Sequence, residues 1–219
     1  MTSTVDSRPV FARVLARAAV LEERRGGAEH RRRLLAGLRG RVLELGAGSG
    51  VSFAYYPPTV TELIAVEPEE HLRAMAQEAA AAAPLPVRVV AGVADDLPAQ
   101  DASMDAAVVT AVLCSVPDPA GALRELARVI RPGGELRFFE HVAARARRLA
   151  RLQRALDATV WPRLNGGCHT NRDTEAAIVA AGFEIEERER FSFRAHVLAA
   201  PVAPRILGRA RRPAGPLRP

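Results

Sequence analysis

The sequence contains 219 residues, the size of one domain with a substantial core. Its 31 basic residues, all arginine, exceed 25 acidic residues for a net charge of +6, and its 48% of hydrophobic residues excludes a disordered chain. Two cysteines without a C-x-x-C pair predict neither a disulfide framework nor a bound metal. No apolar run approaches the roughly 18 residues of a membrane span, so we expect a cytoplasmic protein.

The chain begins with a helical pattern. Apolar residues recur at helical spacing over 8–38, with a break near Gly26 and Gly27. The pattern predicts an N-terminal helical cap over residues 1–40.

A glycine loop then follows the first predicted strand, at 41–45. The sequence from Glu44 to Gly50 reads E-L-G-A-G-S-G, and the next predicted strand, 62–67, ends in Glu67. Glycines let the loop backbone approach a ligand, and an acidic side chain at the end of the following strand can accept both ribose hydroxyl protons. Val51 stands where a dinucleotide fingerprint has its third glycine. The loop therefore predicts a nucleoside cofactor other than a dinucleotide.

Further strands are predicted near 87–91, 105–110, 134–140, 183–191 and 203–210, mostly with helices between them. This alternation predicts an α/β fold with a doubly wound, mostly parallel sheet of seven strands. The last two strands lack a clear helix between them, so we expect an antiparallel edge pair. The prediction is one domain over 41–210, with an insertion near 143–166 and a flexible tail at 211–219.

Four motifs occur in order along about a hundred residues. After the glycine loop and Glu67 come a turn at Gly92–Pro98, a D-x-S-x-D pattern at Asp101–Asp105 and the R-P-G-G of Arg131–Gly134. Together they resemble the class I S-adenosylmethionine-dependent methyltransferases. The resemblance implies a Rossmann-like fold and S-adenosyl-L-methionine as cofactor. The cofactor-binding residues it implies are Glu44, Gly46, Ala47, Gly48, Gly50, Glu67, Pro68, Ala94, Asp95 and Thr110.

Candidates for the chemistry lie in segments after the later strands. Methyl transfer from a sulfonium is an in-line displacement, which requires a nucleophile held close to the methyl carbon in a dry pocket. His141 and His169 are candidate catalytic bases, because imidazole titrates near neutral pH. The alternatives are that Glu140 and His141 tie a lid to the sheet, and that Cys114 is an ordinary buried residue. The candidate pocket residues are Cys114, Glu140, Trp161 and Cys168.

Within these methyltransferases, the chain resembles the membrane-associated alkyl thiol S-methyltransferases of animals and their bacterial relatives. The matching stretches are Phe53–Pro58, Val112–Val116, Arg131–Val142, Trp161, Gly167–Cys168, Arg172–Thr174 and Pro204–Gly208. The resemblance implies S-methylation of a small lipophilic thiol. Two departures are the absence of the apolar membrane anchor and His169, which stands where the animal proteins tend to have another cysteine. The alternatives are a C- or O-methyltransferase of a quinone or secondary metabolite, and a non-catalytic cofactor- or RNA-binding module.

The predicted insertion carries a basic amphipathic helix. Leu149, Leu152, Leu156 and Val160 recur at helical spacing between arginines, and Trp161 follows them. We expect this segment to form a lid over the acceptor pocket. Such a helix could also rest on an anionic membrane, giving a peripheral contact. Nucleic acid is an unexpected partner, because the arginines are interleaved with acidic and apolar residues and the base-amino motif is absent. The sequence leaves the oligomeric state open.

Overall fold

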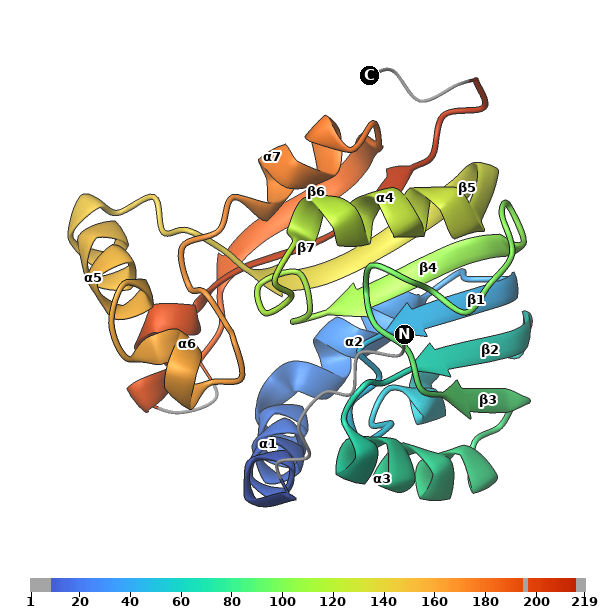
Figure 1. Ribbon diagram of the computed structural model, residues 1–219, viewed down its shortest axis with the longest axis horizontal. Coiled ribbons are helices and arrows are strands. Elements are labelled where there is room, and N and C mark those ends of the chain that lie inside the picture. The colour runs from blue at the N-terminus through green and yellow to red at the C-terminus, as the bar shows by residue number, and fades with distance from the viewer. Residues whose placement is uncertain (1–8, 195–196, 216–219) are drawn as a thin grey trace.

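A computed structural model of the protein describes residues 9–194 and 197–215 (Figure 1). In this part of the chain, seven strands form one sheet in the order β3-β2-β1-β4-β5-β7-β6. The strands are β1 Gly40–Leu45, β2 Val60–Val66, β3 Val87–Val90, β4 Met104–Thr110, β5 Ile130–His141, β6 Glu184–Ser192 and β7 Pro204–Arg211. Only β7 runs against its neighbours, β5 and β6. The predicted α/β sheet with an antiparallel last strand is confirmed.

Helices cover both faces of the sheet (Figure 1). The helices are α1 Pro9–Glu22, α2 Ala28–Leu35, α3 Glu70–Ala81, α4 Pro119–Val129, α5 Arg147–Asp157, α6 Trp161–Leu164 and α7 Thr174–Ala180, with short turns η1 Glu23–Gly27, η2 Phe53–Tyr55 and η3 Val197–Val202. The chain builds β1 to β3 toward one edge and then returns to place β4 and β5 on the other side of β1. This reversal in strand order places the carboxyl ends of β1 and β4 side by side, and α/β proteins bind ligands beyond the strand ends at such a point.

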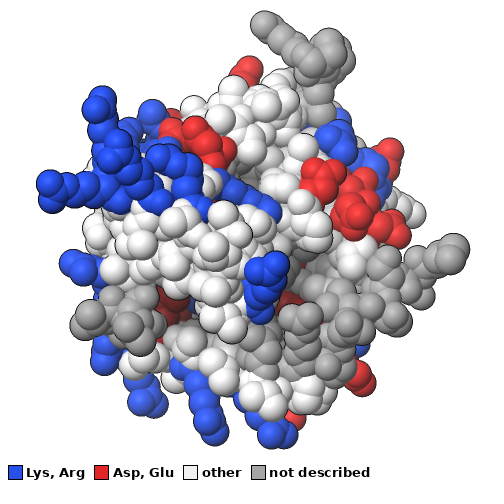
Figure 2. All heavy atoms as spheres, turned by 60° about the vertical axis from the view of Figure 1, so that its left-hand side comes forward, with Lys and Arg blue, Asp and Glu red and all other residues white. Residues whose placement is uncertain are grey.

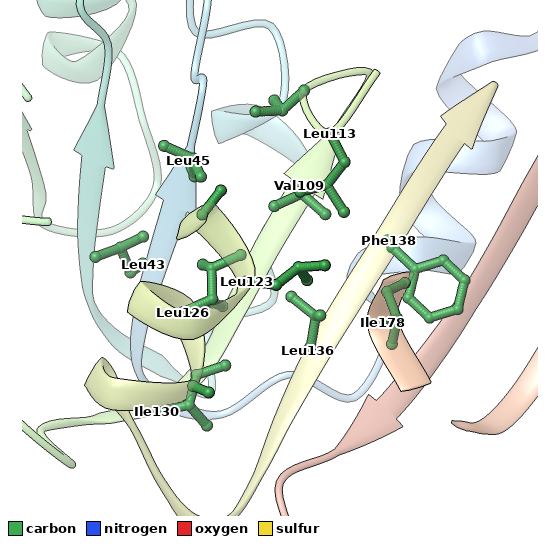
Figure 3. Packing of buried hydrophobic residues seen from close by; sticks show 14 of the residues in the cluster. Leu43, Leu45, Val109, Leu113, Leu123, Leu126, Ile130, Leu136, Phe138 and Ile178 are labelled. Carbon is green, nitrogen blue, oxygen red and sulfur yellow. The ribbon is translucent and has the colours of Figure 1, made fainter. Parts of the chain in front are cut away.

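The two faces of the sheet carry two hydrophobic clusters. Leu43 and Leu45 of β1 belong to the cluster that contains α4, whereas Val42, the residue before Leu43, belongs to the cluster that contains α2. This alternation follows the period of two along a strand. Figure 3 shows the first cluster, in which Leu123 and Leu126 of α4 lie over the strands. The buried strands fix the positions of the loops at their carboxyl ends.

The N-terminal helices confirm the predicted break. Gly26 has a φ of +112° and stands inside η1, which joins α1 to α2. Glu23 accepts a hydrogen bond from Arg31 at 2.8 Å, an ion pair across the break. Residues 1–8 of the predicted cap lie outside the described part.

The predicted insertion forms α5 and α6, at the end of the sheet where the parallel strands finish (Figure 1). A polar residue anchors α5. The buried amide of Gln153 donates to the carbonyl oxygens of Val142, Thr170 and Pro201 and accepts from the Ala144 nitrogen. In Figure 2, which brings this side of the molecule forward, basic side chains cluster on the surface.

The C-terminal strand extends to Arg211, and the Arg212 nitrogen donates to the Gly134 carbonyl oxygen at 2.9 Å. Residues 216–219 of the predicted tail lie outside the described ranges. Among the helices that the structure describes, none has the length and apolar character needed to cross a membrane.

Candidate active site

The glycine loop begins with a close contact between β1 and the segment after β4. The Gly46 and Ala47 nitrogens donate to the Val66 carbonyl oxygen at 2.8 and 3.1 Å, which turns the chain away from the sheet. Gly46 has a φ of +70°, and a Cβ there would lie 2.4 Å from Val112 Cγ2. Only glycine therefore fits. The loop after β1 and the loop after β4 are thus neighbours.

The ribose-binding candidate Glu67 holds this loop. Its carboxylate is buried and accepts from the Gly48 nitrogen at 2.8 Å and from the Glu69 nitrogen at 3.0 Å. Burial raises the pKa of Glu67, and these two backbone donors partly oppose the shift. Gly48 has a φ of +58°, and a Cβ built on it would meet nothing within 4 Å. The open space beside Gly48 and the adjacent carboxylate fit a nucleoside ligand.

Glu44, the other acidic residue of the motif, points into the interior. Its carboxylate accepts from the Ser52 hydroxyl at 2.5 Å and the Tyr56 hydroxyl at 3.1 Å. Burial is the main cause of its raised pKa. Through these two hydrogen bonds, Glu44 holds the segment that follows the glycine loop to the end of β1.

The end of β4 carries two unusual features. The buried Thr110 hydroxyl oxygen has no hydrogen-bond partner among the described residues. Ala111 has a φ of +55°, a conformation that costs a non-glycine residue free energy and occurs often at functional sites. The unpartnered Thr110 hydroxyl and the strained, exposed Ala111 are both typical of a ligand-binding site at the end of β4.

The remaining cofactor candidates lie in the glycine loop and in the segments after β2 and β3. The Gly50 nitrogen donates to Ala47, closing the loop. Pro68 accepts from the Arg73 guanidinium at 2.9 Å, Ala94 packs at the edge of the α4-side cluster, and Asp95 is exposed. Their contacts with a cofactor stay predictions.

Beyond the loop after β4, three candidate residues meet in the interior. Cys114, His141 and Cys168 are buried, and one potential ligand atom from each lies within 4.8 Å of the others. Cys168 Sγ is 3.2 Å from His141 Nε2. The Trp161 indole donates to the same sulfur, also at 3.2 Å. The structure thus gathers four residues that the sequence places in separate segments.

The segment carrying Cys114 is fixed from several sides. The Glu140 carboxylate accepts from the backbone nitrogens of Val112, Leu113 and Cys114, at 2.8 to 3.4 Å. Burial raises the pKa of Glu140 to about 7, with the backbone donors opposing the shift. Among the described residues, its hydrogen bonds thus go to the loop after β4, so Glu140 positions Cys114 there.

Arg172 also binds the loop after β4. Its guanidinium donates to the carbonyl oxygens of Leu113 and Val116 at 2.6 and 2.7 Å. The His169 nitrogen donates to the Cys114 carbonyl oxygen at 2.8 Å. These contacts bind the segment after α6 to the loop after β4.

Gly167 allows the two segments to come this close. Its φ is +85°, and a Cβ there would lie 2.9 Å from the Ser115 carbonyl oxygen. The adjoining Cys168 is thereby placed beside His141 and Cys114. A larger residue at position 167 would separate the two cysteines.

Burial and neighbouring groups set the protonation of this cluster. Desolvation lowers the pKa of His141 to about 3, with the Arg205 guanidinium adding to the effect, so the imidazole is neutral near pH 7. Burial raises the pKa of the Cys114 thiol, while its hydrogen bond to Cys168 lowers the pKa of the Cys168 thiol. Cys168 is therefore the thiol that ionises first.

The second histidine candidate lies at the edge of the cluster. His169 is half-buried, and its Nδ1 is 2.8 Å from the Gly167 carbonyl oxygen and 3.2 Å from Arg172 Nη2. Asp173 caps α7 by accepting from the Ala176 nitrogen, as a helix N-cap does. The assignment of a catalytic base to His141 or His169 stays a prediction.

Sequence reasoning did not assign roles to Arg172, Gln153 or Asp157. Asp157 accepts from the backbone nitrogens of Thr170 and Asn171, which fixes the turn before α7. Arg172 stood inside one of the stretches used for the family resemblance, so it could have been proposed as a structural clamp. Gln153 and Asp157 carry no such signal, because they lie in an ordinary amphipathic pattern.

The sequence and the fold of this chain are similar to those of known methyltransferases. Residues 43–138 match a family model described as a methyltransferase domain. The human thiol S-methyltransferase TMT1B is 36% identical over 181 residues, covering 80% of this chain and 73% of that protein. Mouse TMT1B is 37% identical over 183 residues, with the same coverage. A solved S-adenosylmethionine-dependent methyltransferase from Mesorhizobium loti shares the fold, with a TM-score of 0.61 at 21% identity over 83% of this chain and 95% of that one.

The fold, the glycine loop and these matches define a methyltransferase that uses S-adenosylmethionine. More narrowly, the chain belongs to the methyltransferase family that contains the thiol S-methyltransferases.

Proposed function

We propose that this methyltransferase transfers the methyl group of S-adenosylmethionine to the sulfur of a small lipophilic thiol. The observation that carries the proposal is the 36% identity, over 80% of the chain, to a protein named as a thiol S-methyltransferase. The candidate site supports it by its position. Val112 touches the cofactor loop at Gly46, and Cys114 lies two residues further along.

A thiol acceptor also suits the chemistry of the site. A free thiol has a pKa of about 8.5, so a few per cent is already thiolate at neutral pH. The thiolate is a strong nucleophile, and a positively charged sulfonium nearby favours it further. The main task of the protein is therefore to hold the sulfur in line with the methyl carbon and to exclude water.

The proposal is tested by comparing matched acceptors with the purified protein. An alkyl thiol, an alcohol and an amine with the same carbon skeleton are each supplied with S-adenosylmethionine, and methylated product is measured by mass spectrometry. We expect methylation of the thiol in preference to the other two. Methylation of a quinol or phenol without activity on any thiol would favour the C- or O-methyltransferase alternative. Salt-dependent RNA binding without turnover would favour the binding-module alternative.

The helices α5 and α6 form the part of the molecule that we propose contacts an anionic membrane. Leu152, Val160 and Leu164 are 48%, 51% and 71% exposed, so apolar side chains of this region face solvent. The exposed arginines beside them are Arg145, Arg147, Arg148, Arg151, Arg154 and Arg163. Basic residues next to exposed apolar side chains suit a surface that binds anionic headgroups.

Co-sedimentation with vesicles tests the membrane contact. Binding is expected with phosphatidylserine vesicles, weaker binding with phosphatidylcholine vesicles, and a further decrease at high salt. Leu152→Asp should weaken binding, whereas Val179→Asp is a matched control because Val179 is 56% exposed on α7. Equal binding by the two variants would contradict the proposal.

The lid role is proposed for α6 in particular. The Trp161 indole, at the start of α6, donates to Cys168 Sγ, which supports a lid role for α6, whereas Leu152 on α5 is 48% exposed. Trp161→Ala should therefore raise the KM for the acceptor, and Leu152→Asp should leave that KM unchanged in the absence of membrane. An unchanged KM in Trp161→Ala would remove the lid role.

A further inference from the structure

We propose that Cys114, His141 and Cys168 bind one soft divalent cation of the Zn²⁺ type, with the fourth coordination position open to the sulfur of the acceptor. The metal site stands on the geometry of these three side chains. The role of the acceptor sulfur as fourth ligand rests on the proposed thiol methylation.

The distances fit a tetrahedral site. Zn²⁺ holds cysteine sulfur at about 2.3 Å and histidine nitrogen at about 2.0–2.1 Å, which places neighbouring ligand atoms roughly 3.5–3.8 Å apart. Cys168 Sγ and His141 Nε2 are 3.2 Å apart, and with one ligand atom from Cys114 all lie within 4.8 Å. Side-chain adjustments of about an ångström would complete three corners of a tetrahedron.

The chemical types of the ligands narrow the class of cation. Thiolate sulfur and imidazole nitrogen favour Zn²⁺ and other soft ions over Mg²⁺ or Ca²⁺, which take oxygen ligands. Two thiolates would neutralise a divalent charge, so the loaded cluster would carry no net charge in its buried surroundings. Two cysteines and one histidine with an open fourth position is a ligand set found in catalytic zinc sites.

Surrounding groups hold the two cysteine ligands in place, whereas His141 Nδ1 has no hydrogen-bond partner among the described residues. Glu140 and Arg172 fix the loop that carries Cys114, through bonds to its backbone nitrogens and carbonyl oxygens. The Trp161 indole donates to Cys168 Sγ at 3.2 Å, a contact suited to a sulfur that carries negative charge. Supporting contacts of this kind orient metal ligands and tune their basicity. The residues that orient the cysteine ligands thus come from three separate segments of the chain.

The position of the cluster links it to methyl transfer. It lies after β4 and at the end of β5, next to the loop that Gly46 brings against Val112. An acceptor thiol that binds the cation loses its proton to solvent, because coordination deprotonates a thiol. A sulfur lone pair then forms the new S–CH3 bond while the C–S⁺ bond of the donor breaks, and its electron pair returns to the donor sulfur. The neutral thioether is a weaker ligand than the thiolate, so it can leave.

Metal binding is tested first, without reference to turnover. Protein without a histidine tag is purified under reducing conditions, incubated with ZnCl2, dialysed and analysed by inductively coupled plasma mass spectrometry. We expect about one zinc per chain, and with CoCl2 the visible absorption of tetrahedral cobalt together with a thiolate-to-cobalt charge-transfer band. Cys168→Ser and His141→Ala should lower zinc affinity by about 10²-fold or more. His71→Asn, on α3, is the control that should keep the metal.

Circular dichroism of each variant separates lost ligands from lost fold. Because Cys168→Ser could unfold the protein, the cobalt spectrum of the unmodified chain provides an independent readout. Absence of zinc and of thiolate-to-cobalt absorption in reduced, folded protein would overturn the metal site, even if thiols were methylated. Recovery of Cys114 and Cys168 as a disulfide from protein kept under reducing conditions would also overturn it.

The fourth-ligand role has its own test. Addition of an alkyl thiol to the cobalt-loaded protein should strengthen the charge-transfer band, whereas the matched alcohol should not change it. An unchanged band, with cobalt bound, would overturn the fourth-ligand role and leave the metal site standing. Full thiol methylation by chelator-treated, metal-free protein would overturn the same role while supporting the proposed function. No methylation of any thiol by metal-loaded protein would overturn the proposed function and the fourth-ligand role that rests on it, and would leave the metal site standing.

Discussion

The cofactor side of the site, around the glycine loop, and the acceptor side, around Cys114, differ in how far apart in the sequence their bonded residues lie. Around the glycine loop, Glu44 bonds Ser52 and Tyr56, which are 8 and 12 residues away, and the Gly48 nitrogen bonds Glu67, 19 residues away. Around Cys114, the Arg172 guanidinium bonds carbonyl groups 56 and 59 residues away. These hydrogen bonds of the cofactor side lie within one β-loop-β unit, whereas those of Arg172 join segments that are far apart in the chain.

This difference has an energetic consequence. Contacts between distant segments form only after a larger loss of chain entropy, and regions held by few of them open more easily. We therefore expect a change on the cofactor side to affect the whole domain. A change on the acceptor side should first release the segment 143–175.

The largest expected effect is at Gly46. Gly46→Ala places a Cβ 2.4 Å from Val112 Cγ2 at a φ of +70°, so it adds a steric clash to backbone strain. We expect a loss of roughly 2–5 kcal/mol in the free energy of unfolding. Gly37→Ala is the matched control, because Gly37 has a φ of +75° and nothing within 4 Å of a built Cβ. Urea unfolding measures both variants, and equal losses would show that the contact between the two loops contributes nothing.

The next effect is at Arg172 on the acceptor side. Arg172→Ala leaves the Leu113 and Val116 carbonyl oxygens without their charged donor, so we expect a loss of about 2–4 kcal/mol. Hydrogen exchange should show the loss concentrated in 143–175 and the loop after β4. Arg163→Ala, which removes an exposed arginine bonded to one carbonyl, should cost less than about 0.5 kcal/mol. Exchange that increased equally throughout the sheet would contradict the local character of the acceptor side.

The same difference explains what could be predicted from the sequence. Short local sequence patterns indicate the strands, the break at Gly26 and the loop of Gly46–Gly50. The positions of these features were therefore predicted within a few residues. The insertion of β7 between β5 and β6 follows from pairing across the finished sheet and has no local signal. The pattern of alternating elements could predict an antiparallel pair but not its order.

The cluster of Cys114, His141 and Cys168 shows this limit at the site. Each residue was a candidate by itself, and counting two cysteines predicted no metal. Their meeting depends on Gly167 passing close to Ser115 and on the Arg172 clamp. Gln153 is the clearest case, since a polar residue on the amphipathic helix predicted as a lid is completely buried and joins three segments. Roles of this kind can be recognised only when the folded structure shows which residues are in contact.

A smaller effect is expected from Thr110, where the two sides of the site meet. Its buried hydroxyl has no partner in the described structure, so Thr110→Val should leave the free energy of unfolding unchanged or slightly higher. If the hydroxyl binds the cofactor, S-adenosylmethionine affinity should fall by about 5–10-fold in isothermal titration calorimetry. Glu67→Ala should cost more, about 1.5–3 kcal/mol of binding, because a charged acceptor is removed. Unchanged affinity in Thr110→Val would exclude this hydroxyl from the cofactor site.

The smallest effect concerns Glu44 and the dependence of stability on pH. Burial raises the pKa of Glu44 in the folded protein, so the folded state holds this proton more tightly than the unfolded chain does. Its contribution to stability is fully present below the unfolded pKa of about 4.5 and is lost as the pH rises through the folded pKa. Glu44→Gln can accept from one of the two hydroxyls through its amide oxygen and donate to the other through its amide nitrogen, and it does not titrate. Above about pH 4.5, we therefore expect the unfolding free energy of the variant to fall less steeply with rising pH than that of the unmodified protein. Glu78→Gln, which removes an exposed carboxylate of α3, controls for the change in net charge. Parallel pH profiles for Glu44→Gln and the unmodified protein would show that Glu44 is ionised in the fold without cost, and that the interior behind the cofactor loop is more polar than its burial indicates.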